Sequence, residues 1–431
     1  MMRVAAHTLG CKLNFAETSH LLRQFEAAGF SIVGCHETAD IYIINTCTVT
    51  SVAEKKCRNA IRQAAAQNPD ALIAVIGCFA QNDPTRIARM PHVDIILGND
   101  RKHLLFDILS DTGFRRPSKK IVDTTPPTSF QPSYSLGGRT RTFFKIQDGC
   151  DYFCSYCAIP FARGRSRSAT IAQTVAVARE IAAQGTREIV LTGVNTGTFG
   201  LQHGETFIDL LRQLDTVEGI LRYRISSIEP NLITDEVVDF VASSRSFLPH
   251  FHIPLQAGSD KVLRMMRRRY TTTLFASRVE HIKTVMPDAC VAADVITGFN
   301  GEDEDSFAQG KAFISDLPLS YLHVFPYSDR PGTAALKMDE RVPIPVRKER
   351  SLQLRELSDR KRRTFIQSQT GTIRHVLWEH TPHTVGSAPA MQGWTDNYIR
   401  LQRPFDETLA GTVTPYPVTQ STIVDNFECD D

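Results

Sequence analysis

The chain has 431 residues, of which 42% are hydrophobic and 22% charged, and its formal net charge is +2. This length predicts about two to four domains, and the composition is that of a folded protein. The small net charge neither favours nor excludes a nucleic-acid partner. No stretch approaches the roughly 18 apolar residues of a membrane helix. The N-terminal residues lack the apolar run of a signal peptide, so we expect a cytoplasmic protein with no membrane partner.

The first part of the chain alternates strand and helix patterns. Asn14 followed by Glu17 resembles a capping box that starts a helix. The alternation predicts a Rossmann-like, doubly wound parallel α/β domain over residues 1–114. Residues 115–138 are rich in Pro, Ser and Thr and predict an extended linker. Apolar runs predict buried parallel strands at Arg3–Thr8, Ile41–Thr46, Leu72–Gly77 and Asp94–Leu97.

A longer strand–helix series occupies residues 139–368 and ends in a charged helical segment, Val346–Gln369. Its six units predict a partial (β/α)6 barrel, because a standard barrel closes with eight. Residues 369–431 have short alternating strands and many turn residues, which predict a small antiparallel β-barrel. The six barrel strands are expected at Thr142–Gln147, Glu188–Leu191, Arg222–Ser226, His250–Leu255, Val291–Thr297 and Tyr321–Phe325.

Three closely spaced cysteines, Cys150, Cys154 and Cys157, follow the first predicted barrel strand. Thiolates suit iron–sulfur clusters, and a cubane cluster usually takes four of them. Three would leave one iron open for a cofactor, as an open position does on catalytic zinc. Tyr156 lies inside the set and is a candidate to pack on an adenine ring. The alternatives are a zinc site, which usually has paired C-x-x-C spacing, and cysteines that are neighbours by chance.

Cys11, Cys47 and Cys78 each follow a predicted strand of the first domain. Because the carboxyl ends of parallel strands share one edge of a sheet, we expect the three to converge. Gly10 and Gly77 permit tight turns there. The set predicts a second cluster with an open iron, although a single cysteine is more often a small buried hydrophobe. The cysteines predicted to have no such role are Cys35, Cys57, Cys290 and Cys429.

The cysteines stand in longer strings that carry a family resemblance. These strings are HTLGCKLN, INTCTVT, GCFAQ, DGCDYFCSYCAIPFARGRSRS, LTGVNTGTFG, RISSIEP, HFHIPLQAGSDKVLRMMRRRYT, DVITGFNGEDEDSF and FPYSDRPGTAA. Together they resemble the radical S-adenosylmethionine (SAM) methylthiotransferase family over nearly the whole chain. TLGCKLN and NTCTVT are most similar to the branch that acts on threonylcarbamoyladenosine in tRNA. The family usually has a proline where Asn300 stands, which predicts an altered loop.

The resemblance implies an N-terminal methylthiotransferase domain, a radical SAM core and a C-terminal TRAM domain that binds RNA. It implies two [4Fe-4S] clusters and two SAM molecules. One SAM would methylate a sulfur on the second cluster. The other would be cleaved at the first cluster, and its radical would take hydrogen from carbon 2 of the modified adenine at tRNA position 37, 3′ of the anticodon. Such a carbon–hydrogen bond is beyond acid–base side chains, so the cofactor carries the chemistry.

The resemblance also implies tRNA, an external electron donor and a sulfur donor as partners, and we expect a monomer. Three alternatives remain open. The substrate is isopentenyladenosine in tRNA or a ribosomal protein; or the second cluster only relays electrons in another radical SAM reaction; or the chain is a non-enzymatic RNA-binding protein with structural metal sites.

Polar residues after the barrel strands are candidate SAM contacts. A carboxylate such as Glu229 can accept hydrogen bonds from ribose hydroxyls, as acidic residues do in dinucleotide-binding folds. The alternative is that each is a structural residue that caps a strand. With Tyr156, the candidates are Gly193, Asn195, Ser226, Glu229 and Gln256.

Local basic and aromatic residues are candidate RNA contacts, because Arg and Lys clusters track phosphates and small β-barrels stack bases on aromatic side chains. The alternatives are a solvated charged face and core aromatics. The target base must leave its stack to be modified, so we also expect a cavity between the first domain and the barrel that is large enough for one flipped nucleotide. The candidates are Arg264, Arg267, Arg268 and Arg269, the run 360–363, and Trp378, Trp394, Tyr398 and Arg400.

Overall fold

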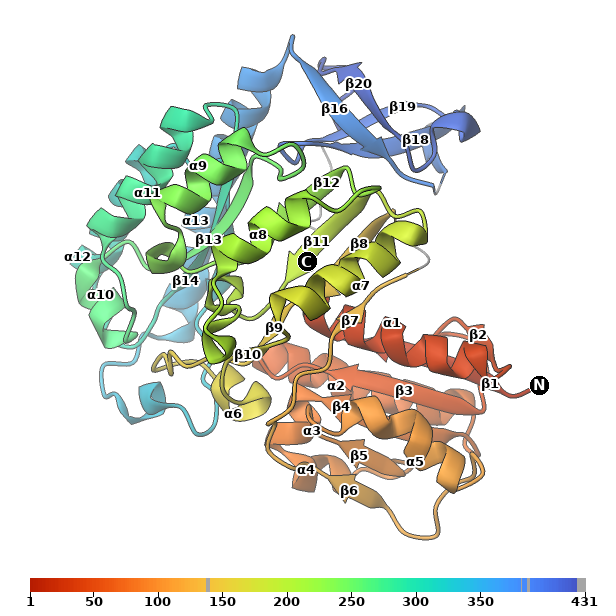
Figure 1. The fold of residues 1–431 in the computed structure, drawn as a ribbon. Helices are drawn as coiled ribbons and strands as arrows, with labels where there is room; N and C mark the ends of the chain where they lie inside the picture. The colour runs from red at the N-terminus through yellow and green to blue at the C-terminus, as the bar shows by residue number, and fades with distance from the viewer. Residues whose placement is uncertain (137–139, 381, 386–387, 425–431) are drawn as a thin grey trace.

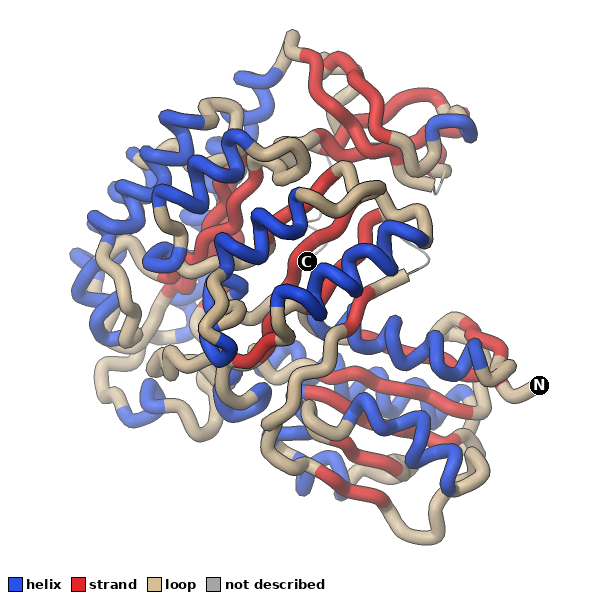
Figure 2. The backbone as a smooth tube through the Cα atoms, in the orientation of Figure 1, coloured by secondary structure: helices blue, strands red, loops and turns tan. Residues whose placement is uncertain are grey.

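A computed structural model describes residues 1–136, 140–380, 382–385 and 388–424. The N-terminal sheet with its helices lies beside a central array of parallel strands, whose outer side is covered by helices, and an antiparallel sheet lies at the far end (Figure 1). The same layering is visible along the backbone tube in Figure 2. In the part of the chain so described, no helix combines the length and apolarity needed to cross a membrane.

The N-terminal region is a six-stranded parallel sheet in the order β2-β1-β3-β4-β5-β6. Both faces are covered, since α1 and α5 pack on one side and α2, α3 and α4 on the other. This confirms the doubly wound prediction. The elements are β1 (Arg3–Thr8), α1 (Lys12–Ala27), β2 (Ser31–Val33), β3 (Ile41–Thr46), α2 (Ser51–Gln67), β4 (Leu72–Gly77), α3 (Cys78–Asn82), α4 (Pro84–Ala88), β5 (Ile95–Leu97), η1 (Lys102–Leu104), α5 (Leu105–Asp111) and β6 (Ile121–Asp123).

Residues 115–138 do more than connect two domains. Their first strand, β6, pairs in parallel with β5 and becomes the edge of the N-terminal sheet. Their second, β7 (Ser133–Tyr134), pairs antiparallel with the first barrel strand. The prediction of a plain linker is wrong in this respect, because a three-residue strand is too short to leave a clear periodic pattern.

The predicted capping box is also wrong. α1 begins directly after Cys11, so Asn14 and Glu17 lie inside the helix, and both are buried. Asn14 Nδ2 instead donates to the backbone oxygens of Leu9 at 2.7 Å and Thr46 at 3.1 Å. Asn14 therefore holds together the ends of two neighbouring strands, each of which leads into a cysteine.

The central region contains all six predicted strands, each parallel to its barrel neighbours. They form two sheets, β8-β11-β12 with β7 at the edge, and β13-β14-β15, joined by parallel bridges from Tyr223 to Phe247 and from Ser227 to His252. The strands are β8 (Arg141–Lys145), β11 (Glu188–Thr192), β12 (Arg222–Ile225), β13 (His250–Gln256), β14 (Cys290–Thr297) and β15 (Tyr321–Pro326), with a short antiparallel pair β9 (Gln147–Asp148) and β10 (Arg167–Ser168).

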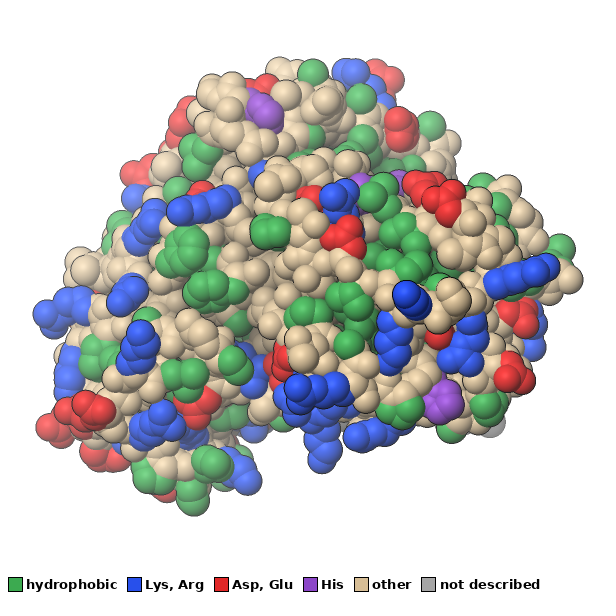
Figure 3. Space-filling model, turned by 90° about the horizontal axis from the view of Figure 1, so that it is seen from below, with side chains coloured by type: hydrophobic (Ala, Val, Ile, Leu, Met, Phe, Trp, Pro, Cys, Tyr) green, Lys and Arg blue, Asp and Glu red, His purple; other side chains and the backbone are tan. Residues whose placement is uncertain are grey.

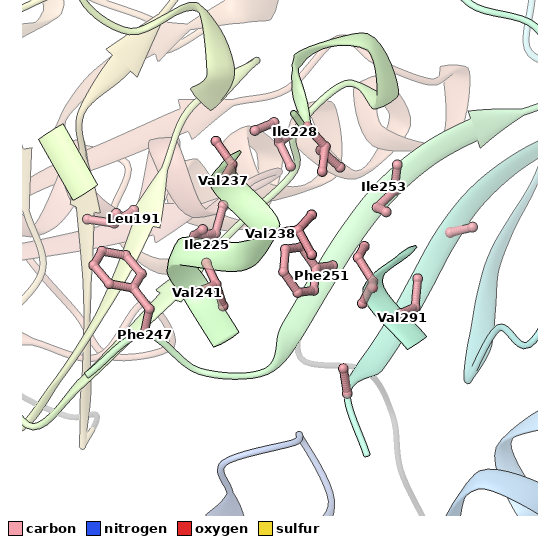
Figure 4. Packing of buried hydrophobic residues seen from close by; sticks show 14 of the residues in the cluster. Leu191, Ile225, Ile228, Val237, Val238, Val241, Phe247, Phe251, Ile253 and Val291 are labelled. Atoms are coloured by element: carbon pink, nitrogen blue, oxygen red, sulfur yellow. The ribbon is translucent and has the colours of Figure 1, made fainter. Parts of the chain in front are cut away.

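Helices cover the outer face of these strands (Figure 1). Figure 4 shows the resulting core, in which Phe251, Ile253 and Val291 of the strands pack near Val238 of α9. Alternate residues of the same strands face the opposite side. The helices are α6 (Ile159–Arg163), α7 (Ile171–Ala183), η2 (Thr196–Thr198), η3 (Leu201–His203), α8 (Phe207–Asp215), η4 (Pro230–Leu232), α9 (Asp235–Ser243), α10 (Asp260–Met265), α11 (Thr272–Val285), α12 (Glu304–Asp316), η5 (Ala334–Lys337) and α13 (Ile344–Gln369).

Helix α1 of the N-terminal region packs against the inner face of the barrel strands. Ala16 forms a small apolar cluster with Phe143 of β8 and Val190 of β11. Phe15 meets Phe143 edge to face, with ring centroids 5.7 Å apart. The N-terminal region therefore covers part of the side that six strands leave open, and this contact sets the distance between the two cysteine sets.

The C-terminal strands form an antiparallel sheet in the order β17-β18-β16-β20, with β19 paired to β18. The antiparallel character confirms the coarse prediction for this region. The elements are β16 (Ile373–Trp378), β17 (His383–Val385), β18 (Ala388–Thr395), β19 (Arg400–Pro404), η6 (Glu407–Leu409) and β20 (Val413–Pro417).

Candidate active site

Cys150, Cys154 and Cys157 lie in one loop that follows β9. Gly149 enters the loop with a φ of 71°, and a Cβ there would lie 2.0 Å from the carbonyl oxygen of Arg165. Burial raises the pKa of Cys157 to about 12, and the neighbouring thiolates of Cys154 and Cys150 contribute to the rise. The three thiols of this loop therefore lie within electrostatic reach of one another. Buried thiols of this kind ionise when a metal supplies positive charge, so the donor set fits a cluster.

A second layer of contacts fixes this loop. The Ser155 hydroxyl donates to the carbonyl of Met265 at 2.8 Å, and the Ser155 amide donates to that of Met266 at 3.0 Å. The Ala335 amide donates to the carbonyl of Ser155 at 2.7 Å, and fully buried Asn300 donates from Nδ2 to the carbonyl of Ala335 at 2.9 Å. The residue that replaces the family's proline therefore supports the segment that packs on the cysteine loop.

Arg268 belongs to this site. Its guanidinium is 3% exposed and forms an ion pair with Glu229. It also donates to Cys154 Sγ at 3.0 Å and to the Tyr156 hydroxyl at 3.4 Å. The prediction that Arg268 contacts RNA is wrong, because the turn after α10 directs this one arginine of the run inward. Burial raises the pKa of Glu229, an effect that Arg268 opposes.

Asn195 and Ser226 offer polar atoms without a partner. Within the described ranges, Asn195 Nδ2 and Ser226 Oγ are buried and make no hydrogen bond. Asn195 Oδ1 accepts from the backbone amide of Glu229 at 3.4 Å, so these residues lie at neighbouring strand ends. Buried polar atoms are nearly always satisfied. Their state fits a site that a polar ligand such as SAM completes.

Gly193 and Gln256 stand at positions where the space around the residue or the backbone conformation is restricted. A Cβ at Gly193 would lie 2.8 Å from Gln147 Oε1, so a larger residue here would force the Gln147 side chain to move. Gln256 has a φ of 65°, rare for a residue with a side chain, at an irregularity where β13 shifts register against β14. Strain of this kind is common at functional sites. Gln256 also lines the cavity described below.

The second cysteine set comes from three loops at one sheet edge. Cys11 precedes α1, Cys47 follows β3, and Cys78 begins α3. A Cβ at Gly10 would lie 2.8 Å from Cys47 Cβ, which shows how closely the first two loops approach. Burial raises the pKa of Cys47 to about 12, and the thiolates of Cys78 and Cys11 add to it. The three cysteines predicted to meet lie at one edge of the sheet, within electrostatic reach of one another.

The remaining cysteines lie elsewhere. Cys57 is buried behind Cys47, whose amide donates to Cys57 Sγ at 3.4 Å. Cys290 is buried at the start of β14, and Cys35 is partly exposed. Cys429 lies outside the described residues.

A buried charge network lies between the two sets. Lys102 and Lys145 both pair with Glu17, and Arg163 pairs with Glu17 and with Asp148 at 2.9 Å. All five side chains are at most 5% exposed. Burial alone would raise the pKa of Glu17, but Arg163 and the two lysines hold it well below its usual range. The sequence offers a signal for one member of this network, since Lys145 stands between Phe144 and Ile146 in an apolar strand.

Helix α6 links both cysteine sets. It starts two residues after Cys157 and ends at Arg163, whose Nη2 donates to Asn14 Oδ1 at 2.6 Å. Asn99 Nδ2 donates to the carbonyl of Ala162 at 2.8 Å and to Cys78 Sγ at 3.5 Å. Amides that hold the second set therefore bond directly to the helix that leaves the first. Neither asparagine was predicted as a site residue.

A cavity of about 320 Å³ touches both regions. This is the size of a small-molecule site. The expected cavity between the first domain and the barrel is thus present. Its walls come from the loop after Cys47 (Val49 and Thr50), the first cysteine loop (Tyr156, Cys157, Ala158 and Ile159) and the ends of β13, β14 and β15 with the residues that follow (Gln256, Asp294, Ile296, Phe325, Pro326, Tyr327 and Ser328).

Of the predicted aromatic RNA contacts, the two tryptophans are not at the surface, and Tyr398 is partly buried. Trp378 and Trp394 are 0% and 1% exposed. Trp394 stacks on Tyr398 at 4.5 Å between ring centroids, and Arg141 of β8 lies over Trp394 at 4.6 Å. The prediction of base stacking on the two tryptophans is therefore wrong. Trp394 is buried against arginines at the start of the barrel strands. The alternation of residues in its own strand does not predict this contact with a distant part of the chain.

The other basic candidates for RNA contact differ in their exposure. Arg400 is half-buried and pairs with Glu379 at 3.2 Å. Arg264, Arg267 and Arg269 are exposed, as are the outer members of the run 360–363. On the face shown in Figure 3, Lys and Arg side chains are interspersed with acidic and apolar ones. The exposed arginines therefore remain candidates for contact with phosphates.

Comparisons with known proteins first define the class. Residues 144–313 match the radical SAM superfamily, and residues 3–98 match uncharacterized protein family UPF0004. The radical SAM methyltransferase TsrM from Kitasatospora setae has a TM-score of 0.55 and 14% identity, covering 78% of this chain and 77% of that chain. The cobalamin-dependent SAM radical enzyme OxsB has a TM-score of 0.53 and 13% identity, covering 84% and 56%. The protein is a radical SAM enzyme.

Closer relatives give the family. Threonylcarbamoyladenosine tRNA methylthiotransferase MtaB of Bacillus subtilis is 39% identical, covering 98% of this chain and 94% of the relative. The protein of the same name from Aquifex aeolicus is 37% identical over 93% and 97%. The tRNA-2-methylthio-N(6)-dimethylallyladenosine synthase of Syntrophotalea carbinolica is 31% identical over 86% and 87%. The chain belongs to the tRNA methylthiotransferase family.

Proposed function

We propose that this protein transfers a methylthio group to carbon 2 of threonylcarbamoyladenosine at position 37 of tRNA. The observation that carries the proposal is one cavity bordered by the first cysteine loop and by the loop after Cys47. Relatives named for this activity span nearly the whole chain. A reaction that joins sulfur from one site to a carbon activated at another needs this arrangement, because positioning supplies much of the rate.

The domain roles follow the same proposal. Residues 1–114 are the methylthiotransferase domain, 139–368 the radical SAM core and 369–431 a TRAM-like barrel that binds tRNA, with 115–138 between the first two. The antiparallel strands after α13 support the last assignment. An external electron donor and a sulfur donor complete the reaction, and the protein acts in the cytoplasm as a monomer.

Each cysteine set holds one [4Fe-4S] cluster in this account. Three ligands leave one iron open, on which SAM or a sulfur atom can bind. When bound, the first cluster and SAM supply the one-electron chemistry that activates an unreactive carbon–hydrogen bond. The protein's own residues then orient the substrate and exclude water.

The side chains around the first set have assignable tasks. Tyr156 packs on the adenine of SAM. Asn195 and Ser226 donate to its polar groups, which satisfies atoms that otherwise lack partners. Arg268 holds its positive charge on Cys154 Sγ and keeps Glu229 in place beside the ribose. Gly193 lets the chain pass close to Gln147.

A second candidate substrate is dimethylallyladenosine in tRNA, because relatives at about the 30% level are named for it. A ribosomal protein as substrate, or a second cluster that only relays electrons, has no such support. Each alternative substrate would yield a different methylthio product, and the electron-relay reaction would yield none. Analysis of the products therefore distinguishes these alternatives.

The experiment is anaerobic reconstitution followed by mass spectrometry of nucleosides from purified tRNA. Wild type is expected to convert threonylcarbamoyladenosine to its 2-methylthio derivative. Cys11→Ala is expected to cleave SAM without forming that product, and Cys35→Ala serves as a matched control that behaves as wild type. Product from Cys11→Ala at the wild-type level, or methylthiolation of dimethylallyladenosine only, would contradict the proposal.

A further inference from the structure

Beneath the shared cavity, three barrel strands bring together side chains that the mechanism above does not use. They are His252 on β13, Asp294 on β14 and His323 on β15. His252 Nε2 lies 2.7 Å from Asp294 Oδ1, and the two imidazole centroids are 5.0 Å apart. One polar atom from each of the three lies within 4.8 Å of the others. All three side chains are only partly buried, so a ligand can reach them.

The cluster is continuous with the cavity. Asp294 and Phe325 line the cavity wall. His323 precedes Phe325 by two residues on the same strand and therefore faces the same side, roughly 7 Å further along β15. His323 is also the direct register partner of Asp294. A group that projects from the cavity along the strands would meet the two imidazoles.

The surroundings of the cluster are cationic. Burial lowers the pKa of His250 well below its usual value, and nearby positive charges lower it further. The carboxylates near this end are already paired. Glu188 pairs with Arg222 at 2.8 Å and with Arg224 at 3.2 Å, and Asp396, which acts on Arg222, pairs with Arg374 at 2.9 Å. Asp294 of the cluster itself lies against His252. The charged groups that act on His250 are Arg224, His252, Lys12 and His323. This end of the barrel therefore favours an anionic ligand.

We propose that this cluster binds the carboxylate of the threonylcarbamoyl substituent, which makes His252 and His323 specificity-determining residues. The inference rests on the proposed function and deepens it. His323 donates a ring N–H to one carboxylate oxygen. His252, protonated on both ring nitrogens, donates Nε2–H to Asp294 and Nδ1–H to the other carboxylate oxygen, and such charge-assisted bonds are short and strong. Asp294 accepts from His252 and holds its ring in position, so it is a positioning residue.

The dimensions fit. With ordinary bond lengths, the ureido link and one further carbon place the substituent's carboxylate roughly 5 Å from the adenine edge. An adenine held at the level of Phe325 would thus present the carboxylate near the imidazole layer. A dimethylallyl substituent carries no charge and cannot accept the hydrogen bonds that the two imidazoles would donate to a carboxylate. A site built to pair a polar group discriminates strongly against a substrate that lacks it.

A metal ion is the rival occupant, because two histidines and one carboxylate are a familiar ligand set. The charges argue against it. Lys12 and Arg224 act on His250, which lies two residues before His252 on the same face of β13, and at this position they would repel a divalent cation and attract a carboxylate. The carboxylate is therefore the better match.

The test compares two anticodon stem–loop RNAs. One carries threonylcarbamoyladenosine, and the other carries the same residue with its carboxylate replaced by a primary amide. The enzymes are wild type, His252→Gln, His323→Gln and a control, His281→Gln, which breaks a similar pair at the surface (His281 to Asp239, 2.9 Å). Each preparation is normalised to its iron content, and RNA affinity is measured by fluorescence anisotropy beside kcat and KM.

Wild type is expected to lose about 10- to 100-fold in kcat/KM on the amide RNA, mostly through KM. His252→Gln and His323→Gln should show a similar loss on the carboxylate RNA and little further loss on the amide, while His281→Gln matches wild type. Equal rates of wild type on the two RNAs would overturn the inference. So would a stoichiometric divalent metal other than iron that His323→Gln loses.

Failure of the proposed function is separate. If wild type forms no methylthio product on either RNA, that function fails, and the anisotropy data still decide the inference. A wild-type preference for the carboxylate RNA that His252→Gln and His323→Gln lose supports it. Equal affinities across all enzymes and RNAs overturn it.

Discussion

The two cysteine sets are built in opposite ways. Cys150, Cys154 and Cys157 share one short loop whose shape depends on local backbone, including positive φ values at Gly149 and Phe153. Cys11, Cys47 and Cys78 come from three loops whose approach depends on the adjacency of β1, β3 and β4 in the sheet. The first set therefore needs only its loop to form, whereas the second needs the whole N-terminal domain. Substitutions should consequently impair cluster binding at one set without impairing it at the other.

Removing a ligand from either set gives the largest expected effect. Cys154→Ala should abolish SAM cleavage and lose about half of the bound iron, since each cubane holds about four irons. Cys47→Ala should lose a similar amount of iron but retain SAM cleavage. Iron analysis with assay of 5′-deoxyadenosine measures both. Cys290→Ala is the control, because Cys290 is buried away from both sets, and equal loss of cleavage in Cys47→Ala and Cys154→Ala would contradict the separation of roles.

Alanine at the glycines of the two loops should separate the sets next. Gly149→Ala places a Cβ 2.0 Å from a backbone oxygen and should prevent loading of the first cluster alone. Gly10→Ala crowds Cys47 and should impair the second cluster alone. Gly185→Ala is the matched control, with a φ of 83° and no atom within 4 Å, so it should cost roughly 1 kcal/mol and load both clusters. Ultraviolet–visible and EPR spectra report which cluster is missing.

Each set also has its own arginine, and this predicts a smaller and reciprocal effect. Arg268 donates to Cys154, while the thiolates of Cys78 and Cys11 act on buried Arg163. Removing a nearby positive charge makes a cluster harder to reduce. Arg268→Met should lower the potential of the first cluster by roughly 60 mV, a tenfold change for one electron, and Arg163→Met should do the same for the second.

Redox titration followed by EPR measures these shifts. Arg163→Met also breaks a buried ion pair, so it should destabilise the fold by about 3–5 kcal/mol. The exposed Arg212→Met is the control and should change neither potential. Equal shifts of both clusters in each variant would mean that the arginines act through the fold as a whole.

The smallest effect is expected at the residue that departs from the family. Asn300→Ala removes one buried hydrogen bond to the carbonyl of Ala335 and should cost about 1 kcal/mol. SAM cleavage should fall only slightly, because the cysteine loop keeps its contacts to Met265 and Met266. Thermal unfolding of the reconstituted protein measures the cost. A complete loss of the first cluster would contradict the view that the first cysteine set needs only its own loop to form.

The strands of the N-terminal sheet could be predicted from the sequence because their apolar runs are continuous. The correct strand ends also led to the prediction of the second cysteine set. β3 and β4 are buried along their whole length, and the ends predicted for β1, β3 and β4 match the structure. Once three strand ends are known, the shared edge of a parallel sheet places their cysteines together. The second set could thus be found by topology although its spacing is irregular.

The errors share one cause, which is that a local pattern does not reveal a distant partner. Asn14 and Glu17 form a plausible capping box until the buried Lys102 and Arg163 are seen to pair with Glu17. Arg268 has the same local charge pattern as its neighbours, yet it alone pairs with Glu229. Trp394 is buried because β8 supplies Arg141. The histidines on β13 and β15 were missed because they are far apart in sequence.

The central claim is that two clusters face one cavity, and the EPR spectrum of the fully reduced protein tests it most directly. At short distance the two paramagnetic clusters broaden each other's signals and speed each other's relaxation. The account predicts such coupling in wild type and its disappearance in both Cys47→Ala and Cys154→Ala. A wild-type spectrum equal to the simple sum of the spectra of the two variants would contradict it.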